Sequence, residues 1–333
     1  MLSYSRFFHF NLEQLSRFRP YLMGMAALFI ILCHAAASHV LMPNWLGKVL
    51  RFGNSGVDLF LFLSGLGCYY SLSKTTQGGI ITFYKRRLSR LLPAYLIIYV
   101  PLNAVLLLIG VRSVFEVALS LTTLEFWLFH RGAWFISLII PLYFLSPLLF
   151  KAMRSRRKWF WTIGLILALT LVCSISVSDQ SKTSVLNNIL GALGRVPSFI
   201  LGMAIAQECM EKKQISVLWP IVLAVLFFPL YRFIPTATLI WMLVPLMLLL
   251  LVWVIRSMIG CHWVESSLGF MGRISLESYL MNISLNSLLS VLITHYRWSS
   301  PLLYGNYVQY LIVVFFGTLL AYLVNIVCKW IVV

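Results

Sequence analysis

Charged residues, and acidic ones above all, are scarce in this sequence. Only 11% of its 333 residues are charged, and Asp and Glu together number 9. A soluble globular protein carries about 25% charged residues, which cover its water-exposed surface. The sequence also has no polar stretch long enough to form a separate soluble domain. These absences exclude a soluble protein and predict a single membrane domain over residues 1–333.

The cysteines lack the spacing of a metal site or a disulfide framework. All 6 are isolated, mostly within or beside apolar segments, with no Cys-x-x-Cys pair and no cluster with histidine. Structural zinc sites and redox motifs need such clusters. We therefore expect no metal site and no permanently bound cofactor.

Basic residues are in excess, with 26 Lys and Arg and a net charge of +17. In a soluble protein this excess would suggest a nucleic-acid partner. Here the basic residues cluster in short loops between apolar segments, as the positive-inside rule describes for membrane proteins. We expect contacts with membrane lipid and no nucleic acid.

Hydrophobic residues make up 61% of the chain and form runs near the length that a membrane-spanning helix needs. We expect an all-α integral membrane protein, a bundle of about ten transmembrane helices at 20–39, 54–73, 88–110, 133–150, 159–177, 188–207, 215–232, 236–255, 268–294 and 306–331. A further apolar segment, 114–129, is short and contains two glutamates. It is typical of a re-entrant or interfacial segment.

The distribution of Lys and Arg over the loops predicts the orientation. With the N-terminus in the cytosol, 17 of the 26 basic residues lie on the cytosolic side and 7 on the outer side, while Arg195 and Arg273 fall inside predicted helices. The positive-inside rule then predicts a multi-pass cell-membrane protein with both termini in the cytosol.

Ionisable side chains at membrane depth are costly, so each is a candidate for function. His34 lies about five residues before the outer end of the first predicted helix, and Asp58 about five residues into the second. At 1.5 Å per residue both lie roughly 7 Å below the outer boundary. A carboxylate that bonds one imidazole nitrogen leaves the other free as a base. The two residues predict either an acid/base pair or a structural tie between two helices.

Two further sets of ionisable residues lie in the predicted helices. Arg195 could neutralise Asp58 or bind an anionic group. Arg273 and Glu277 are four residues apart and would share a helix face, which favours a local neutralising pair.

A dense basic segment, Phe83 to Arg90, leads into the third predicted helix. Membrane topology alone explains several of its charges. Arg86, Arg87 and Arg90 could also converge on a phosphate-rich ligand, because guanidinium groups bind phosphate bidentately. Such a ligand would approach from the cytosol, where coenzyme A thioesters are found.

Six motifs in chain order resemble the acyltransferase-3 family of integral membrane O-acyltransferases. They are GMAALFIILCH (24–34), GVDLFLFLSG (56–65), FYKRRLSRLLPAY (83–95), WFISLIIPLYFLSPLL (134–149), RVPSFILGM (195–203) and GRISLESYLMN (272–282). The resemblance implies transfer of an acyl group, commonly acetyl, from acyl-CoA as co-substrate to a hydroxyl of a cell-surface polysaccharide or a lipid-linked sugar. It implies that His34 and Asp58 are catalytic and that Arg86, Arg87 and Arg90 bind the donor.

The chain departs from the family pattern at two positions that bear on the site. Many members have Arg directly before the first-helix glycine, where this chain has Met23, and Arg19 one turn earlier could replace it. Many members end the ninth-helix motif in His, where this chain has Asn282.

The simplest mechanism is direct transfer, with His34 as the general base and Asp58 orienting it. Arg195 or Ser64 could steady the oxyanion. A transporter or flippase for a glycan or lipid precursor is the alternative, because such proteins also carry buried ionisable groups near the membrane midplane. Against it, the sequence has no inverted repeat and no matching pair of Gly/Pro-broken helices. A sensor domain without catalysis is the third possibility.

Overall fold

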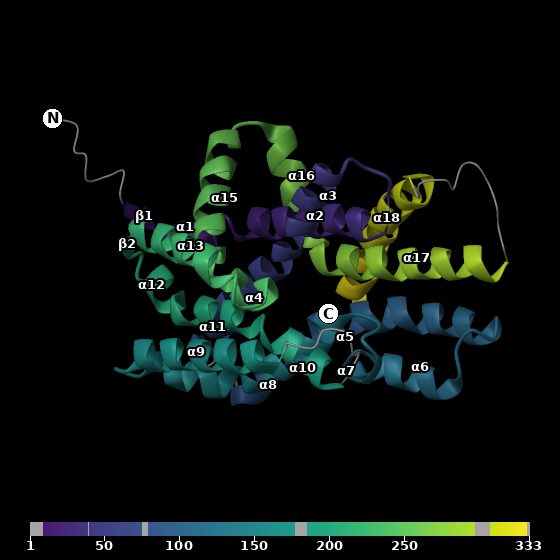
Figure 1. Cartoon of the computed structure of the whole chain (residues 1–333), viewed down its shortest axis with the longest axis horizontal. Helices are drawn as coiled ribbons and strands as arrows, with labels where there is room; N and C mark the ends of the chain where they lie inside the picture. Colours follow the sequence, from purple (N-terminus) through teal and green to yellow (C-terminus); the bar gives the residue numbers. More distant parts are fainter. Residues whose placement is uncertain (1–8, 39, 75–78, 177–184, 297–306, 332–333) are drawn as a thin grey trace.

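The computed structural model describes residues 9–38, 40–74, 79–176, 185–296 and 307–331, and helices make up nearly all of this part of the chain. Two short strands, β1 (His9–Asn11) and β2 (Gln214–Ser216), pair antiparallel with His9 opposite Ser216. They lie with α12 at the left of Figure 1. The predicted all-α class is confirmed.

The first half of the described chain forms ten helical elements. They are α1 (Glu13–Arg17), α2 (Arg19–Ala37), α3 (Asn44–Arg51), the 3₁₀ helix η2 (Phe52–Ser55), α4 (Gly56–Ser73), α5 (Gly79–Leu108), α6 (Val114–Leu121), α7 (Leu124–Phe129), α8 (Trp134–Arg154) and α9 (Lys158–Ser176).

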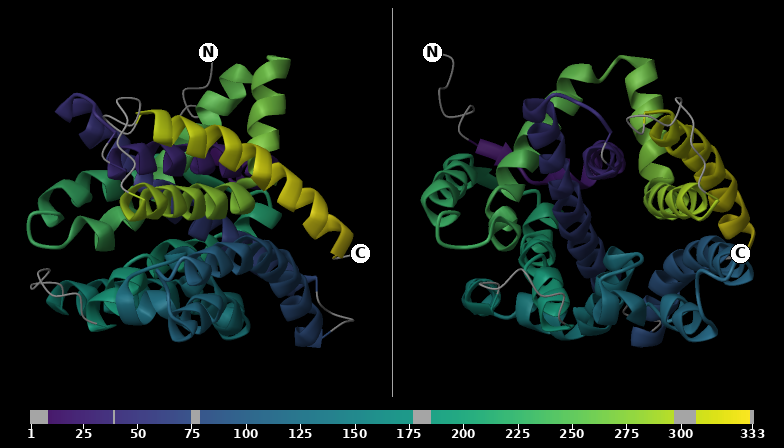
Figure 2. Two further views of the ribbon diagram at one scale, coloured as in Figure 1. Left: turned by 90° about the vertical axis from the view of Figure 1, so that its right-hand side faces the viewer. Right: turned by 45° about the vertical axis from the view of Figure 1, so that its right-hand side comes forward.

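The second half forms the remaining helices. They are α10 (Val185–Leu193), α11 (Val196–Ala204), α12 (Ala206–Met210), α13 (Leu218–Leu230), α14 (Thr236–Leu239), the 3₁₀ helix η3 (Ile240–Met242), α15 (Val244–Met258), α16 (His262–Arg273), α17 (Ser275–His295) and α18 (Tyr307–Ile331). The last two lie side by side in space (Figure 2).

Seven helical segments of the described chain are long and apolar enough to cross a membrane. They are Arg19–Ala36, Asn44–Ser73, Gly79–Leu108, Trp134–Arg154, Val185–Met210, Ser275–His295 and Tyr307–Ile331. Three further apolar helices, in α9, α13 and α15, are shorter. Each of the ten predicted apolar runs therefore contains helix, although the run 215–232 begins in β2, and residues 39, 177 and 306 of three other runs lie outside the described residues. The predicted count of about ten spans is not confirmed.

The segment 114–129 folds as two short helices, α6 and α7. They contain eight and six residues, far fewer than the roughly 20 needed to cross a bilayer. Glu125 is buried on α7, where the Arg112 guanidinium donates to its carboxylate over 2.7 Å. The buried ion pair with Arg112 thus neutralises the negative charge of Glu125, one of the two glutamates in this apolar segment.

Two of the predicted continuous helices are broken. The run 188–207 is interrupted at Arg195, the residue that caps α11, and Pro197 follows in the first turn, where its missing N–H costs nothing. The run 268–294 is interrupted at Ile274, between α16 and α17. There the Arg273 carbonyl accepts hydrogen bonds from the side chains of Arg90, at 3.2 Å, and Asn325, at 3.3 Å. These contacts satisfy a carbonyl at the end of α16.

Helix α4 lies in the interior of the molecule (Figure 1), and every residue from Gly56 to Tyr69 is buried. A helix that is apolar on all sides is expected to be enclosed by others. It crosses α11 with backbones nearly touching, because Gly65 faces the Phe199 carbonyl and Gly202 faces the Phe62 carbonyl. A side chain at either glycine would collide with backbone atoms of the other helix.

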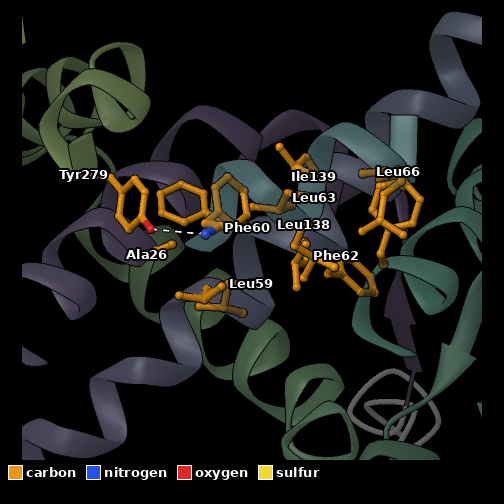
Figure 3. Close-up of a cluster of buried hydrophobic side chains, with 14 of the residues drawn as sticks. Ala26, Leu59, Phe60, Phe62, Leu63, Leu66, Leu138, Ile139 and Tyr279 are labelled. Carbon is orange, nitrogen blue, oxygen red and sulfur yellow. Dashed lines mark hydrogen bonds between the residues drawn. The ribbon is translucent and has the colours of Figure 1, made fainter. Parts of the chain in front are cut away.

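The buried apolar side chains around α4 form one large cluster that includes residues of α2, α5, α8, α11 and α17. Figure 3 shows part of it, where Phe60 and Tyr279 lie in one row of aromatic rings. The Phe135 ring packs against both, with its centre 6.1 Å from that of Phe60 and 5.7 Å from that of Tyr279. The Tyr279 hydroxyl accepts a hydrogen bond from the Phe135 backbone amide at 3.4 Å. This part of the cluster forms one wall of the cavity described next.

Candidate functional site

A cavity of about 560 Å³ lies among α2, α4, α5, α8, α16 and α17, and we call it the central cavity. Four arginines line it: Arg19, Arg87, Arg90 and Arg273. The remaining polar lining comes from hydroxyl groups, on Ser16, Ser64, Tyr143, Ser275 and Tyr279. Among the residues that the structure describes, no carboxylate lines it. Its surface is therefore suited to an anionic ligand.

The central cavity extends along α2 from Arg19 to Ile30. These two residues are eleven positions apart, which corresponds to about 17 Å at 1.5 Å per residue. Helix α4 runs antiparallel beside it, since Gly56 packs on Ile30 while Gly67 packs on Arg19. We call the Arg19 end of the bundle the basic end. The cavity therefore begins at the basic end and stops one helical turn before His34.

Two arginines at the basic end have no acidic partner in the described part of the chain. The Arg87 guanidinium donates to the Gly67 carbonyl and lies over the Phe83 and Tyr143 rings, 5.8 Å from each ring centre. The Arg19 guanidinium lies against the same glycine, and its Nε is buried without a hydrogen-bond partner. Within the described residues neither guanidinium forms an ion pair. Two uncompensated charges in a partly buried cavity favour binding of an anion.

Arg90 differs from them because it has an acidic partner. Its guanidinium makes a bidentate pair with Glu277, whose carboxylate is fully buried in the first turn of α17. Asn325 of α18 donates to the same carboxylate at 3.0 Å. The predicted local pair between Arg273 and Glu277 is therefore wrong. The break at Ile274 puts these two residues on different helices, and α5 supplies the partner instead.

Arg86 faces a second cavity, of about 510 Å³, that it shares with Ser89, Arg90, Arg273, Asn325, Cys328 and Lys329. Arg87 lines only the central cavity, and Arg90 lines both. The three arginines of the predicted donor site thus do not converge on one point. Successive positions on a helix project about 100° apart, so Arg86 and Arg87 face different neighbours.

His34 lies beyond the inner end of the central cavity. Its Nδ1 atom is 2.5 Å from Oδ1 of Asn282, a buried residue of α17. Close by, the Tyr310 hydroxyl of α18 donates to the Ile31 carbonyl. His34 is thus held where α2, α17 and α18 meet.

Asp58 is fully buried at the start of α4 and bonds across to α11. It forms an ion pair with Arg195, and it accepts a 2.9 Å hydrogen bond from the Ser198 hydroxyl. Of the two alternatives for Arg195, the structure shows the ion pair with Asp58, and a role of Arg195 in binding an anion or oxyanion stays a prediction. The hydrogen bond expected between His34 and Asp58 is replaced by these contacts, because His34 has Asn282 as its partner. Catalytic roles for His34 and Asp58 stay predictions.

The remaining predicted residue, Ser64, lines the central cavity midway along α4, and Arg19 lines its basic end. Arg195 and Asp58 do not line it. Sequence reasoning missed Arg273 and Tyr143 as lining residues, and Asn282 as the partner of His34. For Asn282 a signal existed, because it is the position where this chain departs from the family motif.

Within the described residues, His, Cys, Asp and Glu side chains form no group of three that could hold a metal ion. A family model described as an acyltransferase domain, the acyltransferase-3 model, matches residues 21–327, nearly the whole chain. Searches of curated proteins and of solved structures return no match. The matched range includes all of the cavity-lining arginines except Arg19, and it contains His34, Asp58 and Asn282. The chain therefore belongs to the acyltransferase-3 family of integral membrane O-acyltransferases.

Proposed function

We propose that this protein transfers an acyl group, most simply acetyl, from acyl-coenzyme A to a hydroxyl of a cell-surface polysaccharide or its lipid-linked precursor. The observation that carries the donor assignment is the pair of arginines without acidic partners, Arg19 and Arg87, at the basic end of the central cavity. Coenzyme A bears several phosphate oxyanions, and guanidinium groups are suited to bind them.

The basic end is proposed to face the cytosol, where acyl-coenzyme A is made. The excess of Lys and Arg in the loops of that side supports this orientation. Both termini would then be cytosolic and the protein would lie in the cell membrane. The phosphates would stay at the arginines, and the flexible acyl-pantetheine arm would extend along α2 toward His34. The length of the cavity, about 17 Å from Arg19 to Ile30, supports this path.

In the proposed reaction His34 is the general base. Its free nitrogen takes the proton of the acceptor hydroxyl while that oxygen attacks the thioester carbonyl. The C–S bond then breaks, and the imidazolium returns the same proton to the leaving thiolate. The products are the O-acyl ester and coenzyme A, and no other reactant is needed.

In this proposal Asp58 and Arg195 have a structural role and do not contact the substrates. Their ion pair joins α4 to α11 and fixes the start of α4, whose Val57 lines the inner end of the cavity. Ser64 is the hydroxyl of α4 that faces the cavity, but the antiparallel packing of α4 on α2 places it nearer to Arg19 than to His34. Its proposed place is therefore along the path of the pantetheine arm, and not at the oxyanion that forms beside His34.

The test compares two donors that differ only in phosphate. Purified protein in lipid vesicles is incubated with acetyl-coenzyme A or with acetyl-pantetheine, together with cell-envelope glycans, and acetyl transfer is measured. Wild-type protein should prefer acetyl-coenzyme A strongly. Arg19→Met and Arg87→Met should lose that preference while keeping their rate with acetyl-pantetheine.

The matched control is Arg157→Met, at an exposed arginine between α8 and α9 that lines neither the central cavity nor the second cavity. It should leave the preference unchanged. Equal use of both donors by wild-type protein would reject the assignment of the arginines. Movement of glycan across vesicles without acetylation would favour the transporter alternative.

A further inference from the structure

Helices α2 and α17 are joined by two hydrogen bonds that repeat after one turn. His34 pairs with Asn282 at 2.5 Å, and four residues later Asn286 donates to the Ser38 hydroxyl at 2.9 Å. Both pairs connect residues 248 positions apart. Two asparagines thus occupy equivalent positions on one helix face, but one contacts the proposed base and the other contacts only a hydroxyl.

The chemistry of the first pair is directional. The atom of Asn282 nearest the ring is the amide oxygen, which can only accept a hydrogen bond. The imidazole must then carry its proton on Nδ1, and Nε2 keeps its lone pair. The Nε2 lone pair is the one that a general base uses when its Nδ1 is held by a partner. Asn282 therefore occupies the place that sequence reasoning gave to Asp58.

A neutral amide differs from a carboxylate in one respect that matters for acyl transfer. It orients the ring without stabilising the imidazolium by charge. The polar groups near His34 include Tyr310 of α18, whose hydroxyl donates to the Ile31 carbonyl. Cys33, on the same helix as His34, donates to the Arg51 carbonyl at 3.5 Å. Asp58, the carboxylate expected to pair with His34, is already paired with Arg195. A proton taken by His34 is then readily returned to the thiolate.

We propose that Asn282 is the positioning residue of His34, selecting by its amide oxygen the Nδ1–H form that leaves Nε2 free to act as the base. The inference rests on the proposed function for its role in catalysis, although the tautomer itself can be measured without turnover.

The kinetic test uses three variants at the two asparagines that join α17 to α2. Asn282→Leu keeps the side-chain shape but removes the acceptor, and it should lower kcat about 100-fold or more while the KM for donor stays constant. Asn282→Asp restores the acceptor with a negative charge. It should recover most of the rate and move the acidic limb of the pH–rate profile to higher pH, because the charge stabilises the imidazolium.

Asn286→Leu is the matched control, with the same change one turn away in the same interface. If Asn282 only ties α2 to α17, both Leu variants should lose thermal stability alike and kcat equally. Equal kinetic effects, or an acidic limb that does not move in Asn282→Asp, would overturn the proposal.

The second measurement separates this inference from the proposed function. In ¹⁵N-histidine NMR of the folded protein, the His34 signals are assigned by their loss in His34→Ala. Wild-type His34 should be protonated on Nδ1, and Asn282→Leu should shift the ring toward the Nε2–H form. An Nε2–H ring in the wild type overturns the inference. A protein with the Nδ1–H ring and no acyl transfer from any donor would reject the proposed function alone.

Discussion

The Asp58 carboxylate is paired with the Arg195 guanidinium, so Asp58 joins α4 to α11 instead of bonding to His34. Both side chains are buried. Removing one partner of a buried pair leaves an uncompensated charge and costs about 3–5 kcal/mol. Asp58→Ala and Arg195→Leu should each lower the thermal stability of the protein in detergent markedly, whereas the double variant should lose much less than the sum.

A well-folded Asp58→Asn protein that binds donor normally but turns over slowly would contradict this structural role. It would return Asp58 to the catalytic role that the family resemblance implies. Circular dichroism and donor binding, measured on the same preparation as the rate, distinguish the two outcomes.

Lysine substitutions should separate the three arginines of the basic segment. Arg87→Lys should weaken donor binding about tenfold or more, because an ammonium cannot reproduce the planar contact beside Gly67. Arg86→Lys should have little effect, since Arg86 lines only the second cavity. Arg90→Lys should lower stability, because it breaks the bidentate pair with Glu277. Calorimetric titration with a non-hydrolysable donor measures the first two effects. Identical donor affinities for Arg86→Lys and Arg87→Lys would contradict the proposal that Arg87, and not Arg86, binds the donor.

The crossing of α4 and α11 should not tolerate a methyl group. Gly202→Ala places its Cβ against the Phe62 backbone, which cannot move aside as a flexible side chain would. Overpacking of this kind costs about 1–3 kcal/mol or more. Gly191→Ala on α10 is the control, because nothing lies within 4 Å of its added Cβ. It should be neutral or slightly stabilising, as expected for glycine to alanine in a helix. Thermal melting of both variants in detergent tests the difference, and equal melting temperatures would contradict the close crossing.

The proposed orientation predicts which surface cysteines react from outside the cell. In a variant lacking the six native cysteines, Lys48→Cys on exposed α3 should react with an impermeant thiol reagent added to intact cells. Arg156→Cys, exposed in the loop between α8 and α9, should react only after the cells are opened. The reverse pattern would invert the membrane orientation and remove the cytosolic route for the donor.

The sequence alone determined where this chain forms helices and near which helix end its ionisable groups lie. In lipid a backbone must satisfy its own hydrogen bonds, so every long apolar run had to become helical. The rise per residue then fixed His34 and Asp58 near the same end of adjacent helices. The family motifs added the expectation of acyl transfer, which the family match confirms in its general form.

Only the tertiary structure decided which partners those groups find. The position of a residue along a helix follows from counting, but the neighbour that its side chain meets depends on how each helix is rotated and crossed. The Gly65–Gly202 crossing brings α11 against Asp58, and the break at Ile274 turns Glu277 toward Arg90. His34 meets Asn282 from 248 residues away because α17 packs on α2. No local pattern encodes these contacts, since each depends on packing between helices distant in the sequence.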